Sequence, residues 1–314
     1  MPTTETPAFL MSPPRLDWGL RGKANFRSRQ ASSTDARRAR AEWASLADAI
    51  VAAGGEVVVC PPTPAENLTG MIYTAEAGEF YRTSADEPAF VLPNMAAAHR
   101  RAEAPWIARF VERLGFRTTH VDATWEAQGD CIRAASGDRI VHTYGVGPDA
   151  RTERSAYAEV ADLLGPHHVQ IRFDADPWFH GNTFLNVYRA PDSDDHLMVV
   201  CPDALPDEEY AKLRAFVPDA RLHEISRDES LGYDTNALQV NHTVISPTTM
   251  SEATEAALAD IGLQVERLDL GELFVKGGGA PVCLTNRLWG LRDDEVPDTV
   301  LWSANPYIEA HEVG

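Results

Sequence analysis

The amino-acid sequence predicts an α/β protein built from about five similar units. Five segments have the apolar spacing of amphipathic helices, and short runs rich in Val, Ile, Thr and Tyr lie between them as expected strands. One helix alternates with two or three strands, whereas a doubly wound sheet alternates one strand with one helix. Recurrence at roughly 45 to 60 residues is typical of repeat architectures, although the units share no sequence signature. Because the linkers are short, we expect a single domain over residues 1–314.

The expected helices are bounded by ordinary start and stop signals. Glycines follow several of them, Pro206 precedes three acidic residues at the start of one, and residues 249–252 form a capping-box pattern. The expected helices cover residues 34–53, 94–114, 151–164, 206–216 and 249–261. The expected strands cover residues 56–60, 71–74, 90–92, 118–122, 139–143, 168–172, 183–188, 197–201, 238–246, 264–268 and 282–288.

Composition excludes several classes of partner. The net charge of -19 argues against nucleic acid and anionic membranes, and it is compatible with attraction of small cations. The four cysteines form no CxxC pair, which disfavours a zinc site or a disulfide framework. No run approaches the roughly 18 apolar residues of a membrane span, and the N-terminus lacks a signal-peptide pattern. We therefore expect a cytoplasmic protein, and the sequence leaves open whether it forms a homo-oligomer.

A cysteine near the C-terminus follows a glycine-rich turn, in the run KGGGAPVCLT at residues 276–285. Three successive glycines permit backbone conformations closed to other residues and let a ligand approach the main chain, while Pro281 stiffens the exit. This pattern is typical of a presented nucleophile, and Cys283 is the candidate. The alternative is a surface turn followed by a strand, with Cys283 as a small buried apolar residue.

Three further patches place reactive side chains near expected strand ends. His180 follows a tight turn at the start of an apolar strand, and Glu126 and Asp130 flank small or polar residues at a strand entry. Glu76 stands where an expected strand runs into a turn. A thiol nucleophile needs an acid–base partner, a group that orients this partner, and groups that hold the electrophile. Taken alone, each residue also fits a structural histidine or a solvated acid.

Taken together and in this order, the patches resemble the guanidine-modifying superfamily, which contains arginine deiminases, dimethylarginine dimethylaminohydrolases, arginine dihydrolases and amidinotransferases. The matching runs are TAEAG, EAQGD, FHGNT after an Asp-Pro, and KGGGAPVCLT, with support from MSPP near the start and NALQV before the last expected helix. The resemblance covers about residues 8 to 290. It implies the pentein fold, a five-bladed pseudo-symmetric α/β propeller, which agrees with the five units counted above.

The resemblance also implies a cysteine-dependent hydrolase that acts on a guanidino or amidino compound. By position, Cys283 attacks the central carbon as a thiolate, and His180 protonates the departing amine and then activates water against a covalent thiouronium intermediate. Glu126 and Asp130 orient His180 or hold substrate nitrogens, and their two roles stay unassigned. Glu76 holds the planar cation through charge-assisted hydrogen bonds. No metal or organic cofactor is required. The remaining expected substrate-binding positions are Asn182, Gly279 and Asn236.

The sequence departs from the family pattern at positions that recognise the substrate. Asn182 stands where relatives that act on arginine commonly carry aspartate, and Glu76 is longer than their Asp or Asn. No arginine matches the one that clamps a substrate carboxylate in relatives, and Arg82 and Arg101 are weak substitutes. We therefore expect a small cationic guanidino substrate other than free arginine, either alkylated or without the usual amino-acid head group.

Two other functions are compatible with the sequence. An amidinotransferase shares the first half-reaction and passes the amidino group to an amine, but this chain lacks the long insertions of many amidinotransferases. A non-catalytic binding protein on the same fold is the alternative of another class, as in translation factors that bind ribosomal subunits. The complete set of nucleophile, histidine and acids and the net charge of -19 oppose that alternative.

Overall fold

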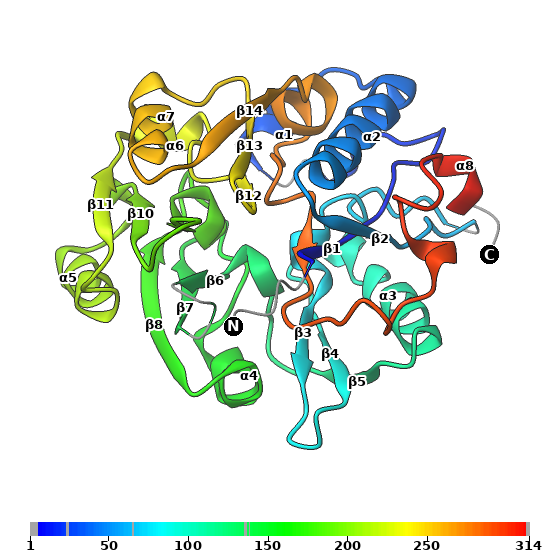
Figure 1. The fold of residues 1–314 in the computed structure, drawn as a ribbon, viewed down its shortest axis with the longest axis horizontal. Coiled ribbons are helices and arrows are strands. Elements are labelled where there is room, and N and C mark those ends of the chain that lie inside the picture. The colour runs from blue at the N-terminus through cyan, green and yellow to red at the C-terminus, as the bar shows by residue number, and fades with distance from the viewer. Residues whose placement is uncertain (1–5, 23–24, 65, 135–136, 138, 312–314) are drawn as a thin grey trace.

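The computed structural model describes residues 6–22, 25–64, 66–134, 137 and 139–311. Within these residues the backbone forms five three-stranded sheets, arranged as a ring with most helices on its outer side (Figure 1). The sheets have the strand orders β15-β1-β2, β3-β4-β5, β6-β7-β8, β11-β10-β9 and β12-β13-β14. The predicted five-bladed α/β propeller is therefore confirmed.

The five blades share one topology. In each, a central strand pairs antiparallel with one neighbour and parallel with the other, and a helix connects the parallel pair. The strands are β1 Ala8–Met11, β2 Glu56–Val59, β3 Glu79–Arg82, β4 Pro88–Leu92, β5 Arg117–His120, β6 Cys131–Ala134, β7 Arg139–Val146, β8 His167–Asp174, β9 Leu185–Arg189, β10 His196–Val200, β11 Arg221–Glu224, β12 Leu238–Val240, β13 Thr243–Pro247, β14 Gln264–Leu268 and β15 Asn286–Arg287. The helices are α1 Phe26–Gln30, α2 Ala36–Ala52, α3 Glu103–Arg113, α4 Tyr157–Leu164, α5 Asp207–Phe216, α6 Arg227–Leu231, α7 Glu252–Ala259 and α8 Ile308–His311.

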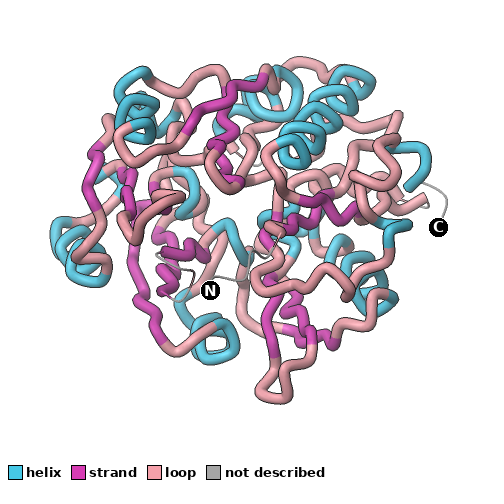
Figure 2. The backbone as a smooth tube through the Cα atoms, viewed as in Figure 1, coloured by secondary structure: helices cyan, strands magenta, loops and turns pink. Residues whose placement is uncertain are grey.

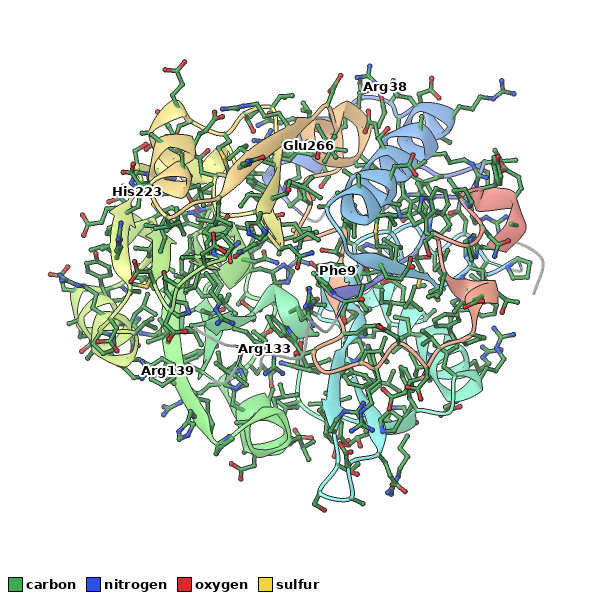
Figure 3. The ribbon with its side chains drawn as sticks, in the orientation of Figure 1. Phe9, Arg38, Arg133, Arg139, His223 and Glu266 are labelled. Atoms are coloured by element: carbon green, nitrogen blue, oxygen red, sulfur yellow. The ribbon has the colours of Figure 1, made fainter. Side chains whose placement is uncertain are left out.

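The first blade is completed by the end of the chain. Strand β15 pairs antiparallel with β1, so that Phe9 faces Arg287 in the register and Leu10 faces Asn286. The guanidinium of Arg287 lies over the ring of Phe9, which is buried. Figure 3 shows Phe9 and Arg133 near the middle of the ring, with Arg38 and His223 toward its rim. This closure places the segment that contains Cys283 directly before β15, close to the ring's centre.

Apolar side chains between the sheets and their helices form the core. Four buried clusters fill the interior, and the largest fully buried side chains include Trp43, Trp125 and Tyr188. Helix α2 shows why its segment folds this way, because Asp35 caps its N-terminus and its buried residues lie along one face. The tube in Figure 2 shows that long loops connect the helices and strands, and several of these loops carry the site described below.

Several predicted elements are wrong. Residues 71–74 form a turn that leads into the 3-10 helix Thr74–Ala77, because the Thr74 hydroxyl bonds the carbonyls of Leu10 and Leu284 in place of strand pairing. The helix predicted from residue 94 begins at Glu103, since the backbone of Asn94 pairs with Trp125. Residues 238–246 form two strands around a turn, and only Asn286–Arg287 of residues 282–288 are in a strand. The strands missed by the prediction are β1, β3, β6 and β11.

Candidate active site

Residues from segments far apart in the sequence line one pocket. Four of the predicted site residues line it, namely Cys283, His180, Glu76 and Gly279. The other four, Glu126, Asp130, Asn182 and Asn236, are buried. Glu126 contacts His180, and Asn182 and Asn236 contact Cys283. Asp130 accepts from the backbone N–H of Gly181, directly after His180. The fold therefore brings all eight predicted residues together.

Cys283 lies in a turn and its side chain is almost inaccessible, with 2% of its surface exposed. Asn236 fixes it from one side, because its Oδ1 accepts from the Cys283 backbone N–H at 3.1 Å and its Nδ2 lies 3.2 Å from Sγ. Asn182 Oδ1 lies 3.9 Å from the same sulfur. Burial, and then the charge of Glu76, raise the pKa of the Cys283 thiol. The thiol is therefore protonated at neutral pH in the unliganded protein.

The glycines before Cys283 have a structural reason. Gly278 has a φ of +90°, which side chains with a Cβ rarely adopt. A Cβ on Gly277 would lie 2.0 Å from the Tyr73 hydroxyl, and one on Gly279 would lie 2.4 Å from the Tyr73 ring. The glycines thus let the backbone pack against Tyr73, in addition to presenting Gly278 and Gly279 at the pocket. They follow a π-helix, Gly271–Lys276, a rare conformation that is frequent at functional sites.

His180 forms a buried ion pair with Glu126. Its Nε2 lies 2.8 Å from Glu126 Oε2, and both side chains are at most 2% exposed. Burial opposes the charged imidazole, but the hydrogen bond to Glu126 and the charges of Asp130 and Glu76 outweigh it and raise the pKa of His180. Despite burial, the hydrogen bond and charge of His180, with further help from Arg151, lower the pKa of Glu126 to about 2. The pair is therefore charged.

Asp130 has a different role from Glu126, which separates the two acids that the sequence left unassigned. Its carboxylate accepts hydrogen bonds from the Thr143 and Thr152 hydroxyls at 2.7 and 2.6 Å and from the Gly181 backbone N–H at 2.9 Å. It thereby anchors the backbone directly after His180. Burial raises the pKa of Asp130, although these donors oppose the shift.

The glycine of the EAQGD run makes room for the imidazole. A Cβ on Gly129 would lie 2.9 Å from the ring of His180. Glu126 before it and Asp130 after it hold the ring and the following backbone. The spacing of the EAQGD run thus lets Glu126, Gly129 and Asp130 each contact the loop that carries His180.

Glu76 lies in a 3-10 helix and binds an internal cation. Its Oε2 accepts from Arg100 Nη1 at 2.8 Å, and its Oε1 lies 3.4 Å from His180 Nδ1. Arg100 also pairs with Glu103, the first residue of α3. Both Glu76 and Arg100 line the pocket, so the predicted substrate-binding acid already shares its charge with the protein's own guanidinium.

The sequence prediction missed the basic residues of the pocket. Arg21, His99, Arg100 and Arg151 line it, whereas Arg82 and Arg101 do not. A signal for Arg100 exists in its spacing of three residues from Glu103, which is typical of a helical ion pair. For Arg21 and Arg151 we find no local signal, because each reaches the pocket from a loop that only the fold brings there.

Comparisons with known proteins agree with this fold. No family model matches the chain. Dimethylarginine dimethylaminohydrolase of Mycobacterium tuberculosis is 28% identical over 286 residues, which cover 90% of this chain and 86% of that protein. The N-terminal domain of ArgZ bound to product, an arginine dihydrolase from cyanobacteria, superposes with a TM-score of 0.78 at 23% identity, over 90% of this chain and 98% of that one.

A third similar structure is a dimethylarginine dimethylaminohydrolase adduct with 4-chloro-2-hydroxymethylpyridine. It has a TM-score of 0.63 at 19% identity and covers 90% of this chain and 100% of that chain. At these identities the two solved structures establish the fold. The protein is a pentein with a buried thiol, histidine and carboxylate in one pocket. Over most of its length the chain is similar to proteins of the guanidine-modifying superfamily.

Proposed function

We propose that the protein is a cysteine-dependent hydrolase that acts on a guanidino or amidino compound. The observation that carries this proposal is that Cys283, His180 and Glu76 line one pocket, with Glu126 paired to the imidazole behind it. A thiol nucleophile, a charged acid and a carboxylate for a planar cation are the groups that amidine hydrolysis needs. The similarity to a dimethylarginine dimethylaminohydrolase supports the same reaction class.

The electrostatics of the pocket couple thiolate formation to substrate binding. Cys283 is protonated in the unliganded site, partly because Glu76 is negative. A bound guanidinium places positive charge between these two groups and favours the thiolate, so that the thiol loses its proton to solvent as the substrate binds. The thiolate then forms a bond to the central carbon, and the C–N bond to the leaving amine breaks as this amine takes a proton from His180.

The second half-reaction uses the neutral imidazole left by the first. His180 takes a proton from a water molecule as the water oxygen bonds to the thiouronium carbon. Collapse of this adduct releases the Cys283 thiolate and a product that carries the new oxygen. Because Nε2 of His180 is paired with Glu126, we assign proton exchange to Nδ1, which makes no hydrogen bond among the described residues.

The charges of the pocket also support a proposal for the substrate. Glu76 lines the pocket with the thiol, and Arg21, His99 and Arg151 add cationic or potentially cationic side chains to the same lining. A molecule with a guanidino group at one end and an anionic group at the other matches this polarity. We therefore favour an alkylated guanidino acid over a guanidino compound without a head group. Asn182 beside the thiol offers no charge to an unsubstituted guanidinium.

Steady-state assays with matched substrate pairs test the proposal. The panel contains arginine, its N-methylated forms, and decarboxylated guanidino amines. We expect release of an alkylamine or ammonia without any added acceptor, and higher kcat/KM for compounds that keep the carboxylate. Turnover that requires an added amine indicates an amidinotransferase, and clear preference for unmodified arginine contradicts the substrate proposal.

The cellular setting is proposed from the cysteines. All four are free and buried, which suits a reducing compartment such as the cytoplasm. Within the described part of the chain, no helix combines the length and the apolar character that a membrane span requires. A single domain over residues 1–314 and a homo-oligomeric state stay predictions.

A further inference from the structure

Charged side chains of alternating sign form a continuous chain beside the pocket, and the three middle members, Arg100, Glu76 and His180, line it. Arg100 Nη2 lies 2.8 Å from Glu103, and Arg100 Nη1 lies 2.8 Å from Glu76. Glu76 then lies 3.4 Å from Nδ1 of His180, whose Nε2 lies 2.8 Å from Glu126. All five side chains are less than a tenth exposed. The chain of charges links the first turn of α3 to the imidazole.

Arg100 is fixed within this chain by several acceptors. Its Nε donates to both carboxylate oxygens of Glu103, and its Nη2 donates to Oε2 of Glu103. Nη2 also donates to the carbonyls of Gly70 and Tyr73, at 2.9 and 3.3 Å. Gly70 is needed for this arrangement, because a Cβ there would lie 2.3 Å from Glu103 Oε1 and 2.4 Å from Arg100 Nε. The guanidinium therefore has one orientation, in which Nη1 points to Glu76.

We propose that Arg100 is a positioning residue that limits how strongly Glu76 holds the proton of His180. Arg100 donates a hydrogen bond to Oε2 of Glu76, while Oε1 of Glu76 faces Nδ1 of His180. A carboxylate shared between two cations attracts each of them less than an unshared one does. The imidazole can then give up its proton to the leaving amine and later accept one from water. This role rests on the proposed hydrolase for its use, but it can be measured without substrate.

Other titratable and charged groups also lie around His180. Glu126 binds Nε2, and Asp130 acts on the imidazole through its charge and anchors the next backbone N–H. Arg151 approaches Glu126 at 3.9 Å. Cys283 lines the same pocket and is protonated in the unliganded protein. None of these groups contacts both Arg100 and His180 as Glu76 does, although the charge of Arg100 also acts on Glu126 and Cys283.

The test is a pH titration of the His180 imidazole by NMR in the unliganded protein. The double variant Arg100→Met/Glu103→Gln removes the guanidinium without leaving Glu103 as an unpaired buried charge. We expect its His180 titration to move to higher pH than in the wild type, because Glu76 then has only the imidazole as a partner. Adding Glu76→Gln should move the titration back below that of the double variant. Arg101→Met, a change of the exposed neighbouring arginine, should leave it unchanged.

Kinetics provide a second measurement for an active protein. The double variant should lose kcat at pH 7 by about tenfold or more with a smaller change in KM, and the alkaline shift of its pH profile should parallel the NMR titration. An unchanged His180 titration in a folded double variant overturns the proposal, as does a triple variant that does not reverse the shift. If the titration shifts as expected but no guanidino compound is turned over by the wild type, the proposed function fails and the role of Arg100 stands.

Discussion

The Nε2 atom of His180 lies 2.8 Å from Oε2 of Glu126, and the two side chains form a buried ion pair behind the pocket. The pKa of Glu126 is about 2, while the pKa of His180 is raised. The pair holds the imidazole with its other nitrogen, Nδ1, toward Glu76 and the pocket. The ion pair with Glu126 favours the protonated imidazole, so His180 can act as an acid in the unliganded protein.

Replacement of Glu126 by Gln should destabilise the protein in a pH-dependent way. Because the pKa of His180 is raised in the folded state, its contribution to the free energy of unfolding is complete below the pKa of the unfolded chain, near 6.5. This contribution is lost as the pH rises through the pKa of the folded state. Because the pKa of Glu126 is lowered in the folded state, its contribution to the free energy of unfolding is complete above the pKa of the unfolded chain, near 4.3. This contribution is lost as the pH falls toward the folded pKa of about 2. The free-energy loss should therefore be largest between about pH 5 and 6.5 and smaller at pH 9. Urea unfolding at these pH values measures it, and an equal loss at both contradicts the charged pair.

Replacement of Cys283 by Ser should remove turnover and leave the fold intact. Serine is close in size to cysteine and fits beside Asn236, but its hydroxyl is a much weaker nucleophile at neutral pH. We expect kcat to fall by at least about a thousandfold with a change in melting temperature of a few degrees. Activity assays and thermal unfolding of the same preparation check this, and persistent activity would refute Cys283 as the nucleophile.

Replacement of Glu76 by Gln should make the thiol easier to ionise. The charge of Glu76 raises the pKa of Cys283, so its loss lowers that pKa, and alkylation by iodoacetamide at pH 8 should be several-fold faster. Peptide mass spectrometry distinguishes Cys283 from the other thiols, all of which are buried. Equal alkylation rates in the two proteins would show that Glu76 does not act on the thiol.

Replacement of Gly279 by Ala should lower activity through displacement of the site. The new Cβ would lie 2.4 Å from the Tyr73 ring and 3.1 Å from Cys283 Cβ, so the nucleophile or the ring must move. A displacement on this scale can cost about a hundredfold in rate. Gly19→Ala is the matched control, because its Cβ would meet only Thr34 Oγ1 at 3.6 Å. Similar kcat values for both variants would contradict the packing explanation.

The sequence was sufficient for the five units and for eight residues that the fold places in or beside one pocket, because helix periodicity and short motifs are local signals. The four missed strands have four residues each, a length at which alternation is a weak signal, although β2 and β5 of the same length are predicted. Closure of the ring by β15 on β1 pairs residues 9 and 10 with residues 287 and 286, and no local pattern encodes such a contact.

The charge of the pocket was not predictable for a similar reason. The sequence alone predicts Glu76 as a carboxylate free to bind a substrate, because its partner Arg100 lies 24 residues away in a segment expected to be helical. The structure has a loop and a 3-10 turn before α3, and this path places Arg100 over Gly70. The roles of Glu126 and Asp130 likewise separate only when the His180 loop is folded between them.

Mass spectrometry of the protein quenched during turnover is the sharpest test of Cys283 as the nucleophile. With a guanidino substrate, we expect a covalent adduct on the peptide that contains Cys283, with the mass of the amidino fragment left after loss of the amine. The adduct should be absent from Cys283→Ser and should disappear when the substrate is exhausted. Turnover without any adduct on Cys283, or with an adduct on another residue, would exclude Cys283 as the nucleophile.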